Sequence, residues 1–391
     1  MQLISLGLTP DTVGSVSRGH PWVYVEGLLA PGDRPPPGTP VRLLDGRGQP
    51  VAFGLADDGA IAVRVLSRHP AAVPDLLRRA VSTAVELRAA VVPANTDAHR
   101  LINGAGDGLP GLVVDRYADL AVLRLYGACW EPWLDELCAA LLAAAPVRSL
   151  ARRLGVRRVD ADSGLLHLAG PPSAERLVVR EAGLRFVVRP AEGQKTGLFL
   201  DQRENRRTVG LVSRDRDVID VFSCTGGFAV HAAAGGARRV TVVDVAPAAV
   251  EDARENLRLN GIDPDRHAFV VADAFRWAPA RPADLVICDP PSLSHDRDAD
   301  GAARRRYRDL ATQYGRAVRP GGLLATASCT ARLSWDRWEQ AVREGLRRAG
   351  RWSWLQRAAE PADHPVLTEH PEARYLKFAL LQRRPDAAID R

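Results

Sequence analysis

The chain has 391 residues, of which 46% are hydrophobic and 26% are charged. These values are typical of a globular protein with two or three domains. It holds no run of about 18 apolar residues, so we expect no membrane span. The N-terminus lacks the basic start and long apolar block of a secretory signal. Five widely spaced cysteines match neither a disulfide framework nor a metal site, which indicates a cytoplasmic protein.

Basic residues exceed acidic ones, and the net charge of +6 favours a polyanionic partner. Of the 53 basic residues only Lys195 and Lys377 are lysine, which leaves 51 arginines. Genomic base composition explains most of this bias, so a retained lysine is informative. Lys195, in "EGQKTG", is a candidate for a place where a compact ammonium is needed and a planar guanidinium does not serve.

Residues 1–72 are predicted to form a small β-barrel or sandwich, because short apolar runs alternate with turn sequences such as "PGDRPPPGTP" and "LDGRGQP". Within "SRGHPWVYVEG", Arg18, His20 and Trp22 are candidate RNA-binding residues, since cations and aromatic rings clamp and stack on nucleic acid. The alternative is that these side chains belong to the core and rim of the barrel.

Residues 73–189 are predicted to form a central α/β domain. The segments "VPDLLRRAVSTAVELRAAV" and "WLDELCAALLAAA" have helical periodicity, and "GLVVDRY" with "LAVLRLYG" is typical of a hairpin. In residues 190–391 the apolar segments "DVIDVF", "RVTVVDV", "AFVVAD", "ADLVICD" and "GGLLATAS" alternate with helical stretches. That alternation predicts a Rossmann-like α/β domain with a parallel, doubly wound sheet.

The first three strands of this sheet carry the marks of a nucleoside-binding site. Gly226 and Gly227 follow the first strand and allow a tight turn close to a ligand. Asp244 ends the second strand, where a carboxylate can accept both hydroxyls of a ribose. Asp273 and Ala274 end the third, a place suited to an adenine. Each acid alone would also serve as a helix cap, but together they favour S-adenosylmethionine, because no phosphate-binding motif accompanies them.

The fourth and fifth strands end in residues suited to chemistry on a planar base. Asp289 begins "DPPS", in which two prolines make the backbone rigid. Cys329 follows "LLATAS", at the carboxyl end of a strand, where open α/β sheets place their ligands. A buried, inert packing role is the alternative for this cysteine.

The motifs "GQKTGLFLDQRENRR", "DVFSCTGGF", "CDPPSLS", "ASCT" and "DHPVLTEHPEARYLKFALL" resemble those of the bacterial 23S ribosomal RNA 5-methylcytosine methyltransferases. "RGHPWVYVEG" and "HRLINGAGDGLPGLVVDRYAD" resemble the first two domains of the same family. The resemblance implies a PUA-like domain over residues 1–72, a central α/β domain over 73–189 and a class I methyltransferase domain over 190–391. It also implies a set of residues that bind S-adenosylmethionine: Lys195, Thr196, Phe199, Asp201, Gln202, Arg203, Phe222, Ser223, Gly226, Gly227, Asp244, Val245, Asp273, Ala274 and Asp289.

In this family's reaction the expected nucleophile is Cys329, whose thiolate would add to carbon 6 of cytosine so that carbon 5 can accept a methyl group. Asp289 would hold the base by its ring nitrogen or exocyclic amine. The cytosine must be single-stranded or flipped out. Arg304, Arg305 and Arg306 are candidate phosphate contacts, with a solvated helix face as the alternative.

Three other functions fit parts of the sequence. The same scaffold could methylate a guanine nitrogen, which needs no covalent intermediate and would leave Cys329 structural. It could act on a small biosynthetic molecule, or it could be a non-catalytic RNA-binding factor that keeps the fold. The sequence does not give the nucleotide modified or the base that removes the carbon-5 proton, and it leaves a homodimer open.

Overall fold

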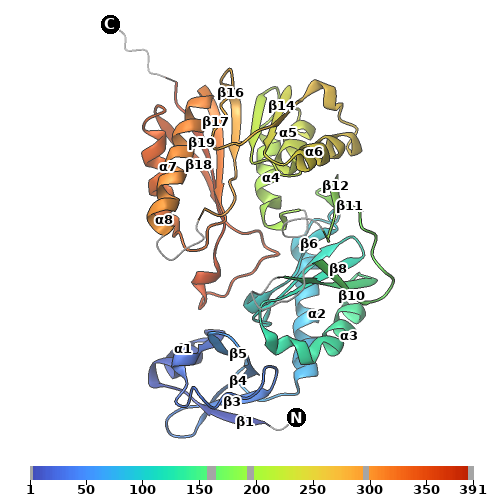
Figure 1. The fold of residues 1–391 in the computed structure, drawn as a ribbon, viewed down its shortest axis with the longest axis vertical. Coiled ribbons are helices and arrows are strands. Elements are labelled where there is room, and N and C mark those ends of the chain that lie inside the picture. Colours follow the sequence, from blue (N-terminus) through green and yellow to red (C-terminus); the bar gives the residue numbers. More distant parts are fainter. Residues whose placement is uncertain (1–2, 156–163, 192–197, 294–298, 386–391) are drawn as a thin grey trace. The chain divides into compact units, whose positions relative to one another are not determined.

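The computed structural model describes residues 3–155, 164–191, 198–293 and 299–385 (Figure 1). Its contacts group the chain into two compact units. The first comprises Met1–Val179, Val188–Thr196 and Ala362–Ala373, and the second comprises Arg180–Val187, Gly197–Pro361 and Arg374–Arg391. The three ranges expected from the sequence stay a prediction, since residues 362–373 group with the first unit although they lie late in the chain.

The first unit begins with a five-stranded sheet in the order β1-β3-β4-β5-β2. Its inward side chains, among them Val23, Val41, Leu43 and Leu55, are fully buried, as the alternating pattern of the strands requires. The sequence did not indicate helix α1, which a proline opens and Gly19 ends in the left-handed conformation. The elements are β1 Ile4–Gly7, α1 Pro10–Arg18, β2 Trp22–Tyr24, β3 Pro40–Leu44, β4 Pro50–Ala56 and β5 Ile61–Ser67.

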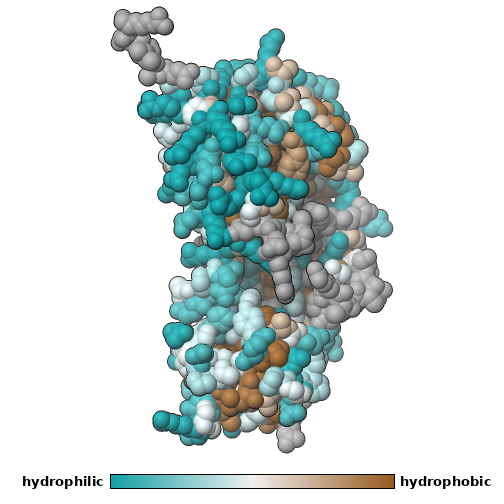
Figure 2. Space-filling view, turned by 60° about the vertical axis from the view of Figure 1, so that its left-hand side comes forward, coloured by the Kyte–Doolittle hydropathy of each residue, from teal (hydrophilic) through white to brown (hydrophobic). Residues whose placement is uncertain are grey.

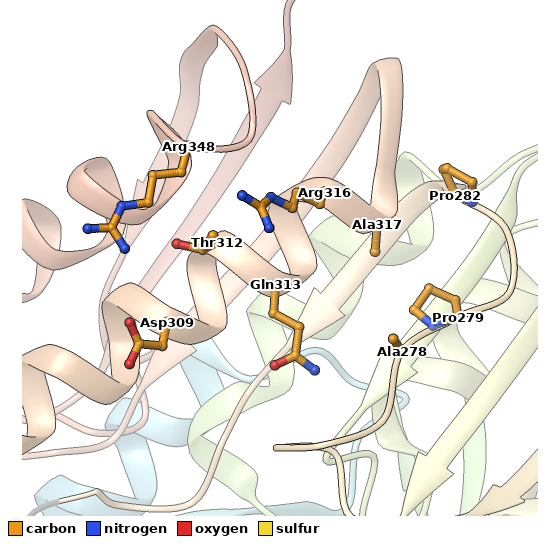
Figure 3. Close-up of a pocket in the computed structure, with 9 residues that line it drawn as sticks. All are labelled: Ala278, Pro279, Pro282, Asp309, Thr312, Gln313, Arg316, Ala317 and Arg348. Carbon is orange, nitrogen blue, oxygen red and sulfur yellow. The ribbon is translucent and has the colours of Figure 1, made fainter.

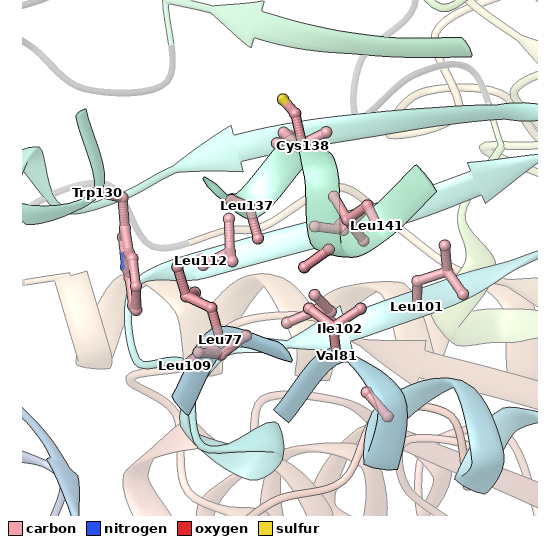
Figure 4. Close-up of a cluster of buried hydrophobic side chains, with 14 of the residues drawn as sticks. Leu77, Val81, Leu101, Ile102, Leu109, Leu112, Trp130, Leu137, Cys138 and Leu141 are labelled. Atoms are coloured by element: carbon pink, nitrogen blue, oxygen red, sulfur yellow. The ribbon is translucent and has the colours of Figure 1, made fainter. Parts of the chain in front are cut away.

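The second sheet of this unit has the order β10-β9-β8-β7-β6 and packs against two helices. The predicted helix over 73–91 and the predicted hairpin are confirmed, because α2 spans Val73–Val91 and β7 pairs antiparallel with β8. Figure 4 shows Leu77 and Val81 of α2 facing the sheet residues Ile102 and Leu112. The remaining elements are β6 Ala98–Asn103, β7 Leu112–Tyr117, β8 Leu120–Leu125, α3 Leu134–Ala144, β9 Ser149–Leu154 and β10 Gly164–Ala169.

The second unit is built on a seven-stranded sheet in the order β15-β14-β13-β16-β17-β19-β18. The five strands predicted from the sequence are parallel neighbours, and β19 and β18 extend the sheet in antiparallel fashion. The strands are β13 Asp217–Val221, β14 Arg239–Asp244, β15 Ala268–Val271, β16 Ala283–Cys288, β17 Val318–Ser328, β18 Trp352–Ala358 and β19 Lys377–Arg383.

Helices cover both faces of this sheet, because successive strand residues point to opposite sides. Val218 packs in one core with α4, α5 and α6, whereas its neighbour Ile219 packs in a second core with α7 and α8 (Figure 1). The helices are α4 Arg203–Leu211, α5 Gly227–Ala234, α6 Pro247–Leu259, α7 Ala299–Ala317 and α8 Trp335–Leu346. None of the helices in the described ranges has the length and apolar composition needed to cross a bilayer.

Hydrophilic side chains cover most of the face drawn in Figure 2, and apolar groups form separate patches between them. Large apolar side chains with substantial exposure include Tyr24, Leu29, Val245 and Leu211. Most such residues need no special account, because apolar atoms contribute much of any protein surface. Val245 is an exception, since it directly follows strand β14 of the seven-stranded sheet.

A small hairpin joins the two units along the chain and carries a buried charge. Strands β11 (Leu177–Glu181) and β12 (Leu184–Val188) are linked by Ala182 and Gly183, both of positive φ, as a tight two-residue turn requires. The side chain of Glu181 is fully buried and accepts hydrogen bonds from Arg206 at 2.7 and 2.5 Å and from His231 at 3.0 Å. Burial alone would raise the pKa of Glu181, but the Arg206 guanidinium and these hydrogen bonds lower it to about 2.

The substitution Glu181→Gln should reduce the free energy of unfolding by about 3–5 kcal/mol at pH 7, because it leaves the buried Arg206 guanidinium without its counter-charge. Urea unfolding followed by circular dichroism would measure this. Since the folded pKa of Glu181 lies below its unfolded value, its stabilisation is present above about pH 4.5 and is lost as the pH falls toward 2. Glu251→Gln is the matched control, because Glu251 pairs with Arg258 at the surface. Equal losses in both variants would contradict the argument.

Candidate cofactor and catalytic site

The candidate site lies at the carboxyl ends of the parallel strands. Strand β13 pairs with β14 on one side and with β16 on the other, so the order of strands along the chain reverses beside β13. Such a switch point opens a crevice above the sheet, which is where doubly wound proteins bind ligands. The loops that follow β13, β14, β15, β16 and β17 therefore supply the residues of the site.

The loop after β13 holds the backbone in an unusual shape. Phe222 and Cys224 have φ values of 58° and 49°, although neither is glycine. Gly226, with φ 76°, caps helix α5, and a Cβ there would come within 2.6 Å of the Cβ of Ala253. Ser223 is buried and donates its backbone N–H to the Val243 carbonyl at 3.1 Å. Left-handed residues outside glycine cost about 1–3 kcal/mol each and gather at binding sites.

Asp244 connects this loop to the end of β14. Its Oδ2 accepts the backbone N–H of Cys224 at 2.8 Å, and its Oδ1 accepts that of Ala246 at 2.9 Å. Asp273 likewise accepts the N–H of Phe275 at 3.0 Å. Both acids thus shape their own turns, and each carboxylate oxygen keeps a further lone pair for a ligand.

The surface beside these acids fits an adenosyl group. Val245 is 68% exposed and Phe275 is 38% exposed, which leaves apolar area uncovered next to the two carboxylates. Phe222 packs edge-on against Phe275 with ring centroids 4.9 Å apart. Carboxylates can accept hydrogen bonds from ribose hydroxyls, and an apolar surface can pack against a purine. This combination suits the adenosyl part of S-adenosylmethionine.

A buried acid that the sequence analysis did not single out lies beneath this loop. Asp220 is 1% exposed, its Oδ2 accepts the N–H of Ala229 at 3.0 Å, and its Oδ1 has no hydrogen-bond partner among the described residues. Burial raises the pKa of Asp220 well above its usual value, and the nearby carboxylate of Asp289 is the second cause of this shift. A carboxyl in the middle of the apolar strand "DVIDVF" was the sequence signal for it.

Asp289 is half-buried after β16 and is held by the segment that begins α4. Gln202 donates its side-chain N–H to Asp289 Oδ2 at 2.9 Å, and Asn205 donates to Gln202 Oε1 at 2.6 Å. Asp201 accepts a hydrogen bond from the Tyr375 hydroxyl at 2.5 Å. The structure therefore brings part of the predicted "FLDQR" segment to the predicted base-binding acid.

Four other members of the predicted cofactor set can be placed only by their position in the fold, and two lie outside the described residues. Phe199 is half-buried just before the short 3₁₀ helix Leu200–Gln202, and Arg203 is 1% exposed at the start of α4. Gly227 begins α5, and the Ala274 carbonyl accepts the Tyr314 hydroxyl at 2.5 Å. Lys195 and Thr196 lie outside the described residues.

Cys329 follows β17 directly and lies one strand away from Asp289. The parallel register pairs Cys288 with Thr326, so the ends of β16 and β17 are adjacent. Cys329 is half-buried, as is Cys224, whereas Cys129, Cys138 and Cys288 are buried. Burial raises the pKa of the thiols of these four other cysteines, to about 11 for Cys224, which disfavours their thiolate forms.

Thr330, which follows Cys329 in the chain, is held by contacts with Lys377, Tyr307 and Leu293. Lys377 donates to the Thr330 carbonyl at 2.8 Å and to the Tyr375 carbonyl at 3.0 Å. The Thr330 hydroxyl bonds the Tyr307 hydroxyl at 2.9 Å and accepts the N–H of Leu293 at 3.2 Å. Burial lowers the pKa of Lys377 to about 8, opposed by the charges of Glu360 and Cys329. Lys377 is the second of the two lysines, and the scarcity of lysine was a signal for it.

The predicted RNA-binding residues differ in their accessibility. Arg18 is exposed, but His20 and Trp22 pack their rings against His370, at centroid distances of 5.5 and 4.1 Å. On α7, Arg305 and Arg306 are exposed, whereas Arg304 is half-buried and pairs with Glu344 at 3.7 Å. Their assignment to RNA stays a prediction.

A pocket of about 440 Å³ opens elsewhere on the same unit (Figure 3). It is lined by the segment 278–282, which precedes β16, and by the C-terminal half of α7, including Gln313 and Arg316. Because these residues precede β16 and β17, they lie toward the amino ends of those strands. This pocket is therefore separate from the candidate site.

A seven-stranded sheet in this order, with a glycine loop after β13 and acids after β14, β15 and β16, defines a Rossmann-like enzyme that binds a nucleoside cofactor. A family model for S-adenosylmethionine-dependent methyltransferases matches residues 128–381, and one for PUA-like domains matches residues 6–68. The chain belongs to this methyltransferase family, and its cofactor is S-adenosylmethionine.

Curated relatives and solved structures agree with this family. "Ribosomal RNA large subunit methyltransferase" from Deinococcus radiodurans is 39% identical, over 94% of each chain. "Ribosomal RNA large subunit methyltransferase I" from Cronobacter sakazakii is 32% identical, over 96% of this chain and 98% of its own. A methyltransferase structure from Streptococcus mutans has a TM-score of 0.83 at 22% identity, over 97% of this chain and all of that one, and so shares its fold.

The substitution Asp244→Ala should weaken S-adenosylmethionine binding about 10- to 100-fold, because it removes the predicted ribose acceptor and the hydrogen bond that shapes the loop at Cys224. Isothermal titration calorimetry would measure the affinity. Asp265→Ala is the control, since the side chain of Asp265 is 89% exposed. An unchanged affinity in the Asp244 variant would contradict the assignment.

Proposed function

We propose that this methyltransferase acts on large-subunit ribosomal RNA and methylates carbon 5 of a cytosine through a covalent adduct with Cys329. Two lines support the proposal. Relatives at 39% and 32% identity that align over nearly the whole chain carry the name of large-subunit ribosomal RNA methyltransferases. The chain also begins with a match to a PUA-like domain, over residues 6–68.

The observation that carries the carbon-5 assignment is the position of Cys329. The parallel pairing of β16 with β17 makes Asp289 and Cys329 follow neighbouring strand ends, on the edge where the cofactor residues also lie. Cys329 is also half-buried, whereas Cys129, Cys138 and Cys288 are buried. Methylation of a nitrogen needs no thiol, so a cysteine at this place favours carbon as the acceptor.

The proposed reaction begins when the Cys329 thiolate adds to carbon 6 of the cytosine, forming a sulfur–carbon bond and moving the electrons of the 5,6 double bond toward carbon 5. S-adenosylmethionine supplies an electrophilic methyl group on a sulfonium. Carbon 5 takes that methyl, and the sulfonium keeps the electron pair of the broken bond. A base then removes the carbon-5 proton, the 5,6 double bond forms again, and the thiolate leaves carbon 6.

Asp289 would orient the base in this reaction. Its Oδ2 is held by Gln202, which in turn is held by Asn205, so the carboxylate is fixed before a substrate binds. Its other oxygen would accept the exocyclic amine of cytosine. A carboxylate acceptor favours the amine of cytosine over the carbonyl oxygen that uracil carries at the same position.

Lys377 is the proposed positioning residue for the nucleophile. Its ammonium donates two hydrogen bonds to backbone carbonyls, one of them that of Thr330 next to Cys329. The Cys329 sulfur lies near enough to influence the pKa of Lys377. A cation at this place stabilises the thiolate, both as nucleophile and as leaving group.

The proposal is tested with labelled S-adenosylmethionine and total ribosomal RNA, with the product mapped by mass spectrometry. We expect 5-methylcytosine in the large-subunit RNA. The variant Cys329→Ala should lose about 10³-fold or more of this activity, because no adduct can form. RNA that contains 5-fluorocytosine should trap the wild-type enzyme as a complex stable to denaturant, because carbon 5 then carries no proton to remove.

Cys138→Ala is the control for the loss of a thiol, since Cys138 lies on α3 in the other unit. Full activity of Cys329→Ala, with the methyl group on a nitrogen, would contradict the carbon-5 mechanism. Transfer to a metabolite alone would contradict the RNA assignment.

The substitution Lys377→Met should slow the alkylation of Cys329 by iodoacetamide about tenfold at pH 7, because the cation beside the thiolate is lost. Peptide mass spectrometry would follow the modified residue. The pKa of Lys377 is lowered to about 8, so Lys377 loses its positive charge as the pH rises through about 8. The difference in alkylation rate between the wild-type protein and Lys377→Met should disappear over the same pH range. Lys377→Arg keeps the charge and should restore much of the rate. Equal alkylation rates at pH 7 would contradict this role.

A further inference from the structure

Three side chains from two distant parts of the chain converge within the first unit. His20 lies between α1 and β2, and His370 and Glu372 lie in the segment 362–373, which groups with the same unit. Their ligand atoms all lie within 4.8 Å of one another. His20 Nε2 is 2.9 Å from Glu372 Oε1, and His370 Nε2 is 3.8 Å from the same oxygen.

The ring of His20 is held at its Nδ1, and its Nε2 faces the carboxylate of Glu372. Nδ1 lies 3.0 Å from the Trp22 carbonyl and 3.3 Å from the Trp22 backbone nitrogen, so the tautomer decides which of the two contacts is a hydrogen bond. Nε2 lies 2.9 Å from Glu372 Oε1. A metal ion would take the Nε2 lone pair while Nδ1 keeps its proton toward the Trp22 carbonyl. Histidines that bind metals commonly donate their other ring N–H to a carbonyl in this way.

His370 provides an independent observation. It is 3% exposed, and neither of its ring nitrogens has a hydrogen-bond partner among the described residues. Trp22 packs against its ring at a centroid distance of 4.1 Å and an interplanar angle of 73°, which holds its orientation. A buried polar nitrogen without a hydrogen-bond partner lowers the stability of the fold by about 1–3 kcal/mol. A metal ion that binds the lone pair of this nitrogen would recover that free energy.

We propose that His20, His370 and Glu372 bind a divalent transition-metal ion of the zinc class. Imidazole nitrogens with one carboxylate suit Zn²⁺, which takes four ligands at about 2.0–2.2 Å. Three ligands come from the protein, and water takes the fourth position on the side of Glu372, whose side chain is 47% exposed. Small movements of that side chain and of the two rings complete the coordination.

The ion would link segment 362–373 to the N-terminal part of the first unit. The segment 362–373 lies between β18 and β19 of the methyltransferase sheet, yet its contacts belong to the first unit. His20 and Glu372 are 352 positions apart in sequence. A metal that closes so long a loop removes much conformational freedom from the unfolded chain, and so stabilises the fold.

The test uses the full chain, stripped of metal with a chelator and titrated with Zn²⁺ by calorimetry, with metal content measured by mass spectrometry. We expect one equivalent of Zn²⁺ and a rise in the melting temperature on binding. Glu372→Gln should weaken binding about 100-fold or more while leaving the fold intact, because this side chain is half-exposed and the change is isosteric. His370→Gln should do the same.

Glu369→Gln is the matched control, since Glu369 is exposed and only three residues before Glu372. Cys329→Ser excludes binding through the half-buried Cys329, and both controls should keep the full affinity. No stoichiometric Zn²⁺ in the folded wild-type chain would overturn the proposal and leave a metal-free His20–Glu372 ion pair. Undiminished binding in Glu372→Gln and His370→Gln would place the metal elsewhere and equally overturn it.

Discussion

The parallel hydrogen-bond ladder of β13, β14, β16 and β17 is the constraint on which the candidate site depends. In a parallel sheet all carboxyl ends meet at one edge, so residues that follow each strand become neighbours whatever their separation in sequence. The register is secured because both faces of the sheet are buried, and a slip by one residue would exchange the two cores. Asp244, Asp289 and Cys329 owe their common location to this ladder.

Buried polar groups fix the orientation of side chains in the candidate site, which the strand pairing alone does not determine. The chain Asn205–Gln202–Asp289 fixes a carboxylate, and Lys377 fixes the turn that holds Cys329. Such groups are costly to bury and are kept only when their hydrogen bonds are satisfied. Asp220 departs from this rule, because its Oδ1 has no hydrogen-bond partner in the part of the chain that the structure describes. The strained backbone at Phe222 and Cys224 lies directly after Asp220 in the chain. Strained residues of this kind cluster at ligand-binding sites.

The segment 362–373 belongs to the first unit in space, although it follows most of the second unit in the sequence. Arg88 on α2 donates to the Asp363 carbonyl at 2.7 Å, and the Asp363 side chain accepts the N–H of Arg100 at 3.0 Å. The Pro365 carbonyl accepts from Asn103 at 2.9 Å. These contacts, together with the His20–Glu372 pair, give the first unit a part that follows helices α4–α8 and strands β13–β18 of the second unit in the sequence.

Much of this architecture could be predicted from local patterns. The helix at 73–91, the hairpin at 112–125 and the five parallel strands each have a periodicity that a few neighbouring residues specify. Helix α1 was missed because its nine residues are short and rich in Ser, Thr and Gly, whose propensities favour turns. Strands β18 and β19 were missed because their pairing joins segments that are not adjacent in the chain: β19 pairs with β17 on one side and with β18 on the other.

The sequence by itself determined the class of fold, the cofactor and the acids at the strand ends, because periodicity and motif spacing are local properties of the chain. Only the tertiary structure decided which groups meet: Gln202 with Asp289, Lys377 with the turn at Cys329, and His20 with Glu372. Such contacts join residues far apart in sequence. They depend on strand register, on the return path of the segment 362–373 and on the burial of each side chain, and these emerge only when the whole chain packs.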